Sequence, residues 1–185
     1  MRVITGSARG RRLNELKGTQ TRPTTDKVKE SIFNCIQFDV EDARVLDLFA
    51  GTGQLGIEAL SRGAQSAVFV DRRTEAVKLI RENLALCRLS DRAQVVCGDS
   101  MGYLSSLRTK FDIVFLDPPY AEDLLERALA HIARFDILSP HGIIVAESPL
   151  EKTLPALCAP YSIYREYRYG KIKVTIYHRG GEEEE

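Results

Sequence analysis

Between residues 44 and 147 the sequence alternates short apolar runs with segments of helical periodicity. The strand-like runs are 45–48, 66–71, 93–97, 111–116 and 142–147. The helices predicted with them span about 54–62, 73–87, 100–107 and 121–134. Strands that alternate with helices pair in parallel through right-handed crossovers, and the helices cover both faces of the sheet. The alternation therefore predicts an α/β fold with a doubly wound parallel sheet.

The segments on either side of this region extend the predicted organisation. Residues 161–169 and 171–178 are typical of a hairpin, which we expect to add an antiparallel strand at one edge of the sheet. Near the N-terminus, residues 2–6 and 10–16 predict two short strands around a turn. We expect three parts in the chain, a basic hairpin arm, a core domain and a disordered acidic tail, at residues 1–22, 23–179 and 180–185.

The charge of the chain is unevenly distributed. Residues 1–30 carry eight Lys and Arg but three Asp and Glu, whereas the whole chain carries 26 of each kind. A basic arm on an otherwise acidic body favours a polyanionic partner such as nucleic acid. A solvated hairpin with ordinary surface charge is the alternative that charge alone leaves open.

The turn after the first predicted strand is rich in glycine and is a candidate cofactor site. Gly51, Gly53 and Gly56 have the spacing G-x-G-x-x-G, which brings backbone close to a ligand at a helix N-terminus. The same spacing occurs in dinucleotide-binding proteins, and Asp71 lies where such proteins place a ribose-binding acid, so NAD(P) is one interpretation. However, Asp47 would repel a pyrophosphate and attract the ammonium of a methionine moiety. We therefore favour S-adenosylmethionine, which has no phosphate.

Acidic residues end the first four strands. They are Asp47, Asp71, Asp99 and Asp117. An acid at one strand end is usually a turn former or helix cap, but four of them beside a glycine turn favour a single ligand crevice. In it, Asp71 would accept hydrogen bonds from the ribose hydroxyls and Asp99 one from the adenine amino group. The candidate cofactor-binding residues are Asp47, Phe49, Ala50, Gly51, Thr52, Gly53, Asp71, Arg72, Asp99, Ser100 and Asp117.

The fourth strand is followed by Asp117, Pro118, Pro119 and Tyr120. Two prolines fix φ and offer no N–H, so the carbonyls beside them can point at a ligand. A carboxylate, fixed carbonyls and an aromatic ring suit an exocyclic amine on a flat base, because they supply two acceptors and a stacking face. A plain strand-ending turn would explain the prolines alone. We take these four residues as the candidate catalytic residues for chemistry on the amino group of a nucleobase.

These residues resemble the class I S-adenosylmethionine-dependent methyltransferases that carry an Asp/Asn-Pro-Pro-aromatic motif. The segments Arg2–Leu13 and Arg22–Asn34 are similar to the RsmD family, and the resemblance extends from about residue 2 to 178. It implies a Rossmann-like, seven-stranded sheet and a methyltransferase domain preceded by an arm that contacts RNA. It also implies methyl transfer to the N2 amine of a guanine in 16S ribosomal RNA, in the small subunit or an assembly intermediate. The candidate RNA-binding residues are Arg9, Arg11, Arg12, Arg22, Thr24 and Lys27.

Three alternatives remain beside this interpretation. A DNA amino-methyltransferase acting on adenine or cytosine could use the same tetrapeptide, although little beyond the short arm is left to recognise a DNA sequence. An NAD(P)-dependent oxidoreductase is the second alternative. The third is a binding module without turnover, against which the intact motifs at four strand ends argue.

The cysteines and histidines show no metal-binding spacing, so we expect no metal site. The four cysteines are scattered beside apolar segments and are expected to be small buried residues. No apolar stretch reaches the roughly 18 residues that a membrane span needs, and no secretory signal begins the sequence. These features predict a cytoplasmic protein.

Overall fold

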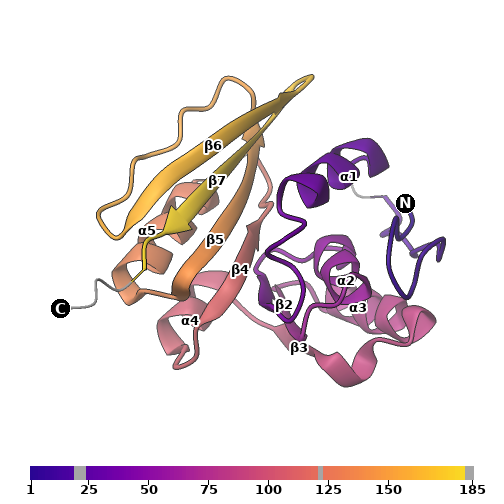
Figure 1. The fold of residues 1–185 in the computed structure, drawn as a ribbon. Helices are drawn as coiled ribbons and strands as arrows, with labels where there is room; N and C mark the ends of the chain where they lie inside the picture. Colours follow the sequence, from indigo (N-terminus) through magenta and orange to yellow (C-terminus); the bar gives the residue numbers. More distant parts are fainter. Residues whose placement is uncertain (19–23, 121–122, 182–185) are drawn as a thin grey trace.

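The computed structural model describes residues 1–18, 24–120 and 123–181, which form one mixed sheet with helices on both faces (Figure 1). The strands are β1 Arg44–Asp47, β2 Ser66–Asp71, β3 Ala93–Cys97, β4 Phe111–Leu116, β5 Leu138–Pro149, β6 Tyr161–Tyr169 and β7 Ile172–Arg179. The helices are α1 Asp26–Cys35, α2 Gln54–Ser61, α3 Thr74–Cys87, α4 Ser100–Ser106 and α5 Leu124–Phe135, with a short 3-10 turn η1 at Ser90–Arg92. The strand order is β3-β2-β1-β4-β5-β7-β6, which confirms the seven-stranded, doubly wound sheet.

The C-terminal hairpin lies antiparallel at one edge of the sheet, as predicted. Strand β7 pairs antiparallel with both β5 and β6, so the hairpin adds two strands and β6 forms the edge. Strand β5 also begins earlier than the predicted residue 142, because Leu138 already pairs with Phe111 before the register shifts to Ile113 and Ile143. The intervening residues have the composition of a turn, which is why the sequence pattern placed the start too late.

Alternate side chains of the central strands enter two separate cores. Val45 and Ile113 pack on the face covered by α1, α2 and α3, whereas Leu46 and Val114 pack on the face covered by α4 and α5. Figure 1 shows these two groups of helices on opposite sides of the sheet. Parallel strands buried on both faces need an apolar residue at every position, which accounts for the continuous apolar runs in the sequence.

The basic segment at the N-terminus packs on the core. Its two predicted strands are reduced to one antiparallel bridge between Arg2 and Arg12. Val3, Ala8 and Leu13 are buried in the same core as α1, α2 and α3. The predicted boundary at residue 22 and most of the predicted acidic tail, residues 182–185, lie outside the described residues. Within residues 1–18 the arm is an integral part of the fold.

The predicted burial of the cysteines is mostly wrong. Cys87 is buried on α3, but Cys35, Cys97 and Cys158 are exposed, because they lie at the ends of elements or in a surface loop. Within the described ranges, no three metal-ligating side chains are placed to share a metal ion. None of the helices in these ranges has the length and apolar character that crossing a membrane requires.

A buried carboxylate joins the arm to the helices. Glu58 on α2 accepts hydrogen bonds from the backbone N–H groups of Ile4 and Thr5, at 2.9 and 3.1 Å. Its oxygens also lie 3.5 Å from Lys29 Nζ and 2.9 Å from Arg62 Nε. The side chains of Glu58 and Lys29 are both fully buried. Burial lowers the pKa of Lys29, and the charge of Glu58 opposes that effect.

We predict that Glu58→Gln destabilises the protein by about 3–5 kcal/mol, because it leaves the Lys29 ammonium buried without a counter-charge. Urea denaturation followed by circular dichroism measures the free energy of unfolding. Glu30→Gln, an exposed change on α1, is the matched control and should stay within about 0.5 kcal/mol of the unsubstituted protein. An unchanged urea midpoint for Glu58→Gln would contradict the role of this carboxylate.

Candidate active site

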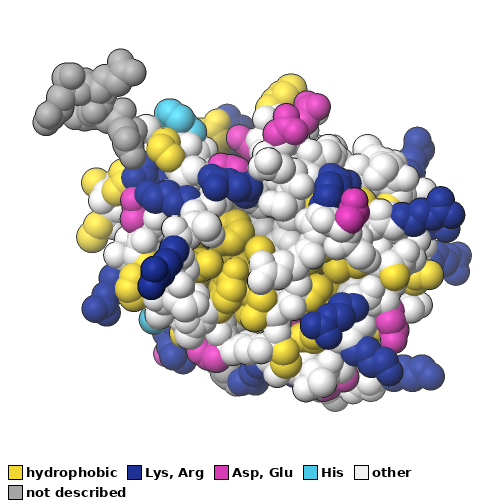
Figure 2. Space-filling view, turned by 90° about the horizontal axis from the view of Figure 1, so that it is seen from below, with side chains coloured by type: hydrophobic (Ala, Val, Ile, Leu, Met, Phe, Trp, Pro, Cys, Tyr) yellow, Lys and Arg dark blue, Asp and Glu magenta, His cyan; other side chains and the backbone are white. Residues whose placement is uncertain are grey.

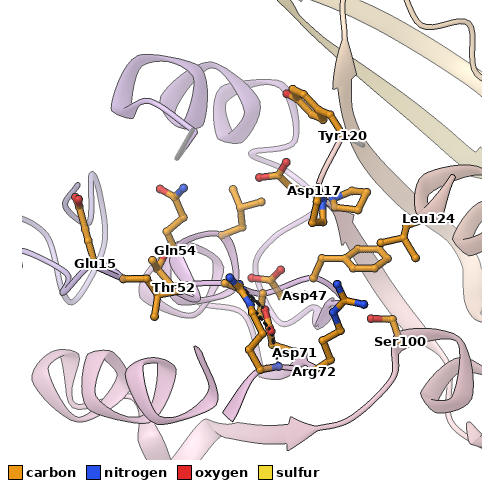
Figure 3. A pocket seen from close by; sticks show the side chains of 18 of the residues that line it. Glu15, Asp47, Thr52, Gln54, Asp71, Arg72, Ser100, Asp117, Tyr120 and Leu124 are labelled. Carbon is orange, nitrogen blue, oxygen red and sulfur yellow. Dashed lines mark hydrogen bonds and ion pairs between the residues drawn. The ribbon is translucent and has the colours of Figure 1, made fainter. Parts of the chain in front are cut away.

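A cavity of about 760 Å³ opens at the carboxyl ends of the parallel strands. Strand β1 lies between β2 and β4, so the chain winds away from it in both directions, and ligands of such sheets bind at this point. The volume is in the range of small-molecule sites. Figure 3 shows Asp117 and Tyr120 on one side of the cavity, Glu15 and Thr52 on the opposite side, and Asp47 and Asp71 between them.

The structure brings almost all of the candidate residues together. All four strand-end acids line this one cavity, as do all four candidate catalytic residues. Of the candidate cofactor residues, only Gly53 does not line it. The ten that do are Asp47, Phe49, Ala50, Gly51, Thr52, Asp71, Arg72, Asp99, Ser100 and Asp117.

The glycine turn is required by the packing between α2 and the sheet. Gly53 caps α2 with φ of 81°, in the left-handed region that glycine adopts without strain. A Cβ on Gly56 would lie 2.3 Å from the ring of Phe69 on β2, so only glycine lets the helix approach this closely. Asp47 Oδ2 accepts a hydrogen bond of 3.0 Å from the Gly56 N–H and ties the helix to the end of β1.

Asp47 forms part of the cavity floor and is 2% exposed. Its pKa is raised to about 7, mainly by burial and to a smaller extent by the charge of Asp71, while the hydrogen bond from the Gly56 N–H opposes the rise. A cationic ligand beside this carboxylate would stabilise its charged form.

The next two acids are already held by the protein. Asp71 accepts hydrogen bonds from the backbone N–H of Gly51 and from the backbone and guanidinium of Arg73, at 2.9–3.2 Å. Asp99 Oδ2 caps α4 through the Gly102 N–H at 2.8 Å. Their ribose and adenine contacts stay predictions. Arg73 was not predicted, although its position two residues after Asp71 is a usable signal.

Other lining residues were also missed by the sequence analysis. They are Met1, Glu15, Leu16, Gln54, Leu55, Arg73 and Leu124. Three of these belong to the N-terminal arm, whose packing over the cavity no local pattern indicates. Gln54 directly follows the glycine turn, is 7% exposed and has a buried Oε1 without a hydrogen-bond partner. This oxygen is an open acceptor at the cavity wall for a ligand N–H or O–H.

A second polar group borders the cavity on the β4 side. The Thr24 hydroxyl lies 3.2 Å from Asp117 Oδ2 and 2.9 Å from Glu147 Oε2. Tyr120 donates a hydrogen bond of 3.1 Å to Glu147 Oε1. Burial and the charge of Glu147 raise the pKa of Asp117 well above its usual range, while Thr24 opposes the rise. The predicted RNA contact of Thr24 is therefore wrong in this structure, because its side chain is 1% exposed and bonded inside the site.

The remaining candidate RNA-binding residues lie on the surface where they are described. Arg9, Arg11 and Arg12 are exposed on the arm, and Lys27 is exposed on α1. Arg22 lies outside the described residues.

The chemistry of the cavity fits S-adenosylmethionine. Carboxylates of five residues line it against two guanidinium groups, and one of these, of Arg73, is bonded to Asp71. Such a wall suits a cationic ligand with hydroxyl and amino donors, and the unpartnered Gln54 oxygen adds an acceptor for them. The fold and this site define a methyltransferase that uses S-adenosylmethionine rather than NAD(P).

The chain belongs to the RsmD family: the family model described as Conserved hypothetical protein 95 matches residues 1–178. YlbH of Bacillus subtilis, provisionally named an rRNA methyltransferase, is 46% identical over 98% of this chain and 100% of its own length. Ribosomal RNA small subunit methyltransferase D of Escherichia coli is 36% identical over 97% of this chain and 90% of its own. The solved structure of the E. coli protein yhhF, provisionally described as a methyltransferase, is 35% identical and superposes with a TM-score of 0.87 over 97% of this chain and 98% of its own.

We predict that S-adenosylhomocysteine binds about tenfold more weakly at pH 6 than at pH 8. Below a pKa of about 7 the Asp47 carboxyl takes up a proton and no longer attracts the ligand ammonium, whereas above it the carboxylate is ionised. Isothermal titration calorimetry measures the affinity. Asp47→Asn, which is neutral at both pH values, should bind weakly with little pH dependence; an equal dependence in this variant would assign the titration to another group.

Proposed function

We propose that this protein transfers a methyl group from S-adenosylmethionine to the exocyclic N2 amine of a guanine in 16S ribosomal RNA, in the cytoplasm. The observation that carries the proposal is the position of Asp117, a half-buried carboxylate that lines the cavity beside the half-exposed ring of Tyr120. Relatives named small-subunit ribosomal RNA methyltransferases support the choice of RNA. The small subunit or an assembly intermediate is the particle that this substrate implies.

The site has groups that can make the amine of the base a better nucleophile. The nitrogen of a guanine amino group is a poor nucleophile, because its lone pair is delocalised into the ring. When bound, S-adenosylmethionine supplies an electrophilic methyl group. Asp117 and the backbone carbonyl of Pro118 accept the two N–H bonds, which favours a pyramidal nitrogen whose lone pair points at that methyl group. Orientation and fixed dipoles then supply most of the acceleration.

Tyr120 provides a face for the base. Its side chain is 46% exposed, and its hydroxyl is fixed by Glu147. Stacking of a base on such a ring contributes about 1–3 kcal/mol. That energy offsets part of the few kcal/mol needed to extract a stacked base, which is lower for a base in a loop. The direct test is mass spectrometry of 16S ribosomal RNA nucleosides from a deletion strain, where one N2-methylguanosine should be missing.

We predict that Asp117→Ala lowers the rate of methyl transfer by about 10²–10³, because one partner of the reacting amine is lost. The affinity for S-adenosylhomocysteine, measured by calorimetry, should change little. Asp91→Ala, an exposed change in η1, should leave both values unchanged. Loss of cofactor binding with normal turnover per bound enzyme would show that Asp117 has a different role.

The exposed cations of the arm support its proposed contact with RNA. Arg9, Arg11 and Arg12 form no ion pair with any described residue, so they can contact phosphates. Met1 and Leu16 of the same arm line the cavity, and Arg12 bridges Arg2 beside Met1. The turn that carries Arg9 packs on Ser61, at the end of α2 away from the cavity, so the proposed RNA path extends from the cavity along the arm. Figure 2 shows Lys and Arg side chains projecting from the right-hand edge of the molecule, the side that carries the arm and α3 in Figure 1.

We predict that the double change Arg9→Ala and Arg11→Ala reduces the slope of log affinity for RNA against log salt by about 1.4–1.8, because two phosphate contacts are lost. Fluorescence anisotropy over a salt series measures the slope. Arg108→Ala with Arg127→Ala removes two exposed cations at the end of α4 and on α5 and should leave it unchanged. If the control pair lowers the slope instead, the RNA lies on the opposite face of the sheet.

A further inference from the structure

Glu147 is a buried acid that the proposed mechanism does not use. It lies on β5 with 4% of its surface exposed. Ala146 pairs with Leu116 across β4 and β5, so the next residues along the two strands, Glu147 and Asp117, are neighbours. The Thr24 hydroxyl bridges their carboxyl groups, with oxygen distances of 2.9 and 3.2 Å. Two acids far apart in sequence therefore share one hydroxyl group.

The number of protons available for hydrogen bonding limits the charge that Asp117 and Glu147 can carry together. A hydroxyl has one proton to donate, so Thr24 cannot donate to both carboxylates at once. If both acids were ionised, one of the two oxygen–oxygen contacts would join two acceptors, and two like charges would lie side by side, one buried and one half-buried. One shared proton removes the conflict, since the protonated acid donates to Thr24 and Thr24 donates to the ionised one.

The surroundings decide which acid carries the charge during catalysis. Asp117 lines the cavity and faces the methyl donor, whereas Glu147 does not line it. Tyr120 donates to Glu147 Oε1, which leaves Oε2 as the oxygen that can hold the proton for Thr24. Burial raises the pKa of both acids, and that of Asp117 rises well above its usual range. A cationic ligand in the cavity lowers the pKa of the acid that lines the cavity, so binding of the donor favours the proton on Glu147.

No other described group competes for this proton. Strand β7 places the apolar Val174 opposite Glu147, and β1 contributes the acid Asp47, whose charge raises the pKa of Asp117. Neither Asp117 nor Glu147 forms an ion pair with a Lys or Arg side chain of the described ranges. A cationic ligand in the cavity would compensate the charge of Asp117.

We propose that Glu147 is a positioning residue that shares one proton with Asp117 through Thr24. It stays neutral, keeps Asp117 ionised toward the amine, and fixes the Tyr120 ring by its other oxygen. The inference rests on the proposed amine methylation. It also gives Thr24, in the Arg-Pro-Thr segment, a function inside the site.

The test compares variants that differ in what they can donate. We expect Glu147→Ala and Thr24→Val to lower kcat by about 10- to 100-fold through misplacement of Asp117, with the affinity for S-adenosylhomocysteine unchanged. Glu147→Gln should recover most of the Glu147→Ala loss, because its amide N–H can donate to Thr24 and its oxygen can accept from Tyr120. Thr24→Ser should likewise recover the loss of Thr24→Val. A Glu147→Gln variant as slow as Glu147→Ala would overturn the proposal, since the charge of Glu147 would then be required.

The pH profile separates this role from simple packing. In the unsubstituted enzyme kcat should fall as rising pH removes the shared proton, because Thr24 then faces two charged acceptors. Glu147→Gln cannot lose that proton and should not show this alkaline fall. An identical fall in both proteins would overturn the proposal.

A measurement without substrate keeps the two proposals distinguishable. Carbon NMR of protein labelled at the Glu carboxyl carbons should show one signal that is absent in Glu147→Gln and titrates above the usual range of glutamate. A normal titration of that signal overturns the shared proton. A raised titration in an enzyme that does not methylate guanine in RNA would leave the shared proton intact and refute only the proposed substrate.

Discussion

The position of β1 in the sheet is the constraint on which the site depends. Its neighbours β2 and β4 lie on opposite sides, so the crossover helices diverge and leave a cavity at the strand ends. Asp47 pairs with Phe115 in the β1–β4 register, so the acid that ends β1 and the acid that follows β4 face the same space. The close approach of α2 at Gly56 then closes the floor of this space behind Asp47.

The buried carboxylate of Glu58 holds the N-terminal arm against the helices beside the cavity. The partners of Glu58 come from the arm, from α1 and from Arg62 at the end of α2, so its charge is fully compensated only when the arm and both helices are assembled. A segment whose sequence suggests a basic appendage is thereby held against the cavity, where Met1 and Leu16 form part of the wall. Glu58 therefore stabilises both the arm that carries the candidate RNA-binding residues and the part of the cavity wall that the arm forms.

The sequence predicted what depends on local patterns. Strands buried on both faces are mostly apolar, so an acid that ends such a strand stands out in the sequence. The sequence analysis did not say which hairpin strand lies inside, although Val174, Ile176 and Tyr177 of β7 beside the exposed, polar β6 were a signal. The contact between Thr24 and Glu147 had no signal, because it depends on packing between segments 123 residues apart. For the same reason Thr24 was taken for a surface residue.

The acids of the cavity are placed to act on different charges. During methyl transfer the positive charge leaves the sulfur and arrives at the amine, while the ammonium of the donor stays unchanged. Asp47, on the floor, would interact with that constant charge and contribute equally to the ground and transition states. In the proposed reaction Asp117 would lie next to the amine and gain interaction as the charge arrives, and only such a difference accelerates the reaction. A neutral Glu147 keeps a second negative charge away from the donor, where it would stabilise the sulfonium before transfer and oppose catalysis.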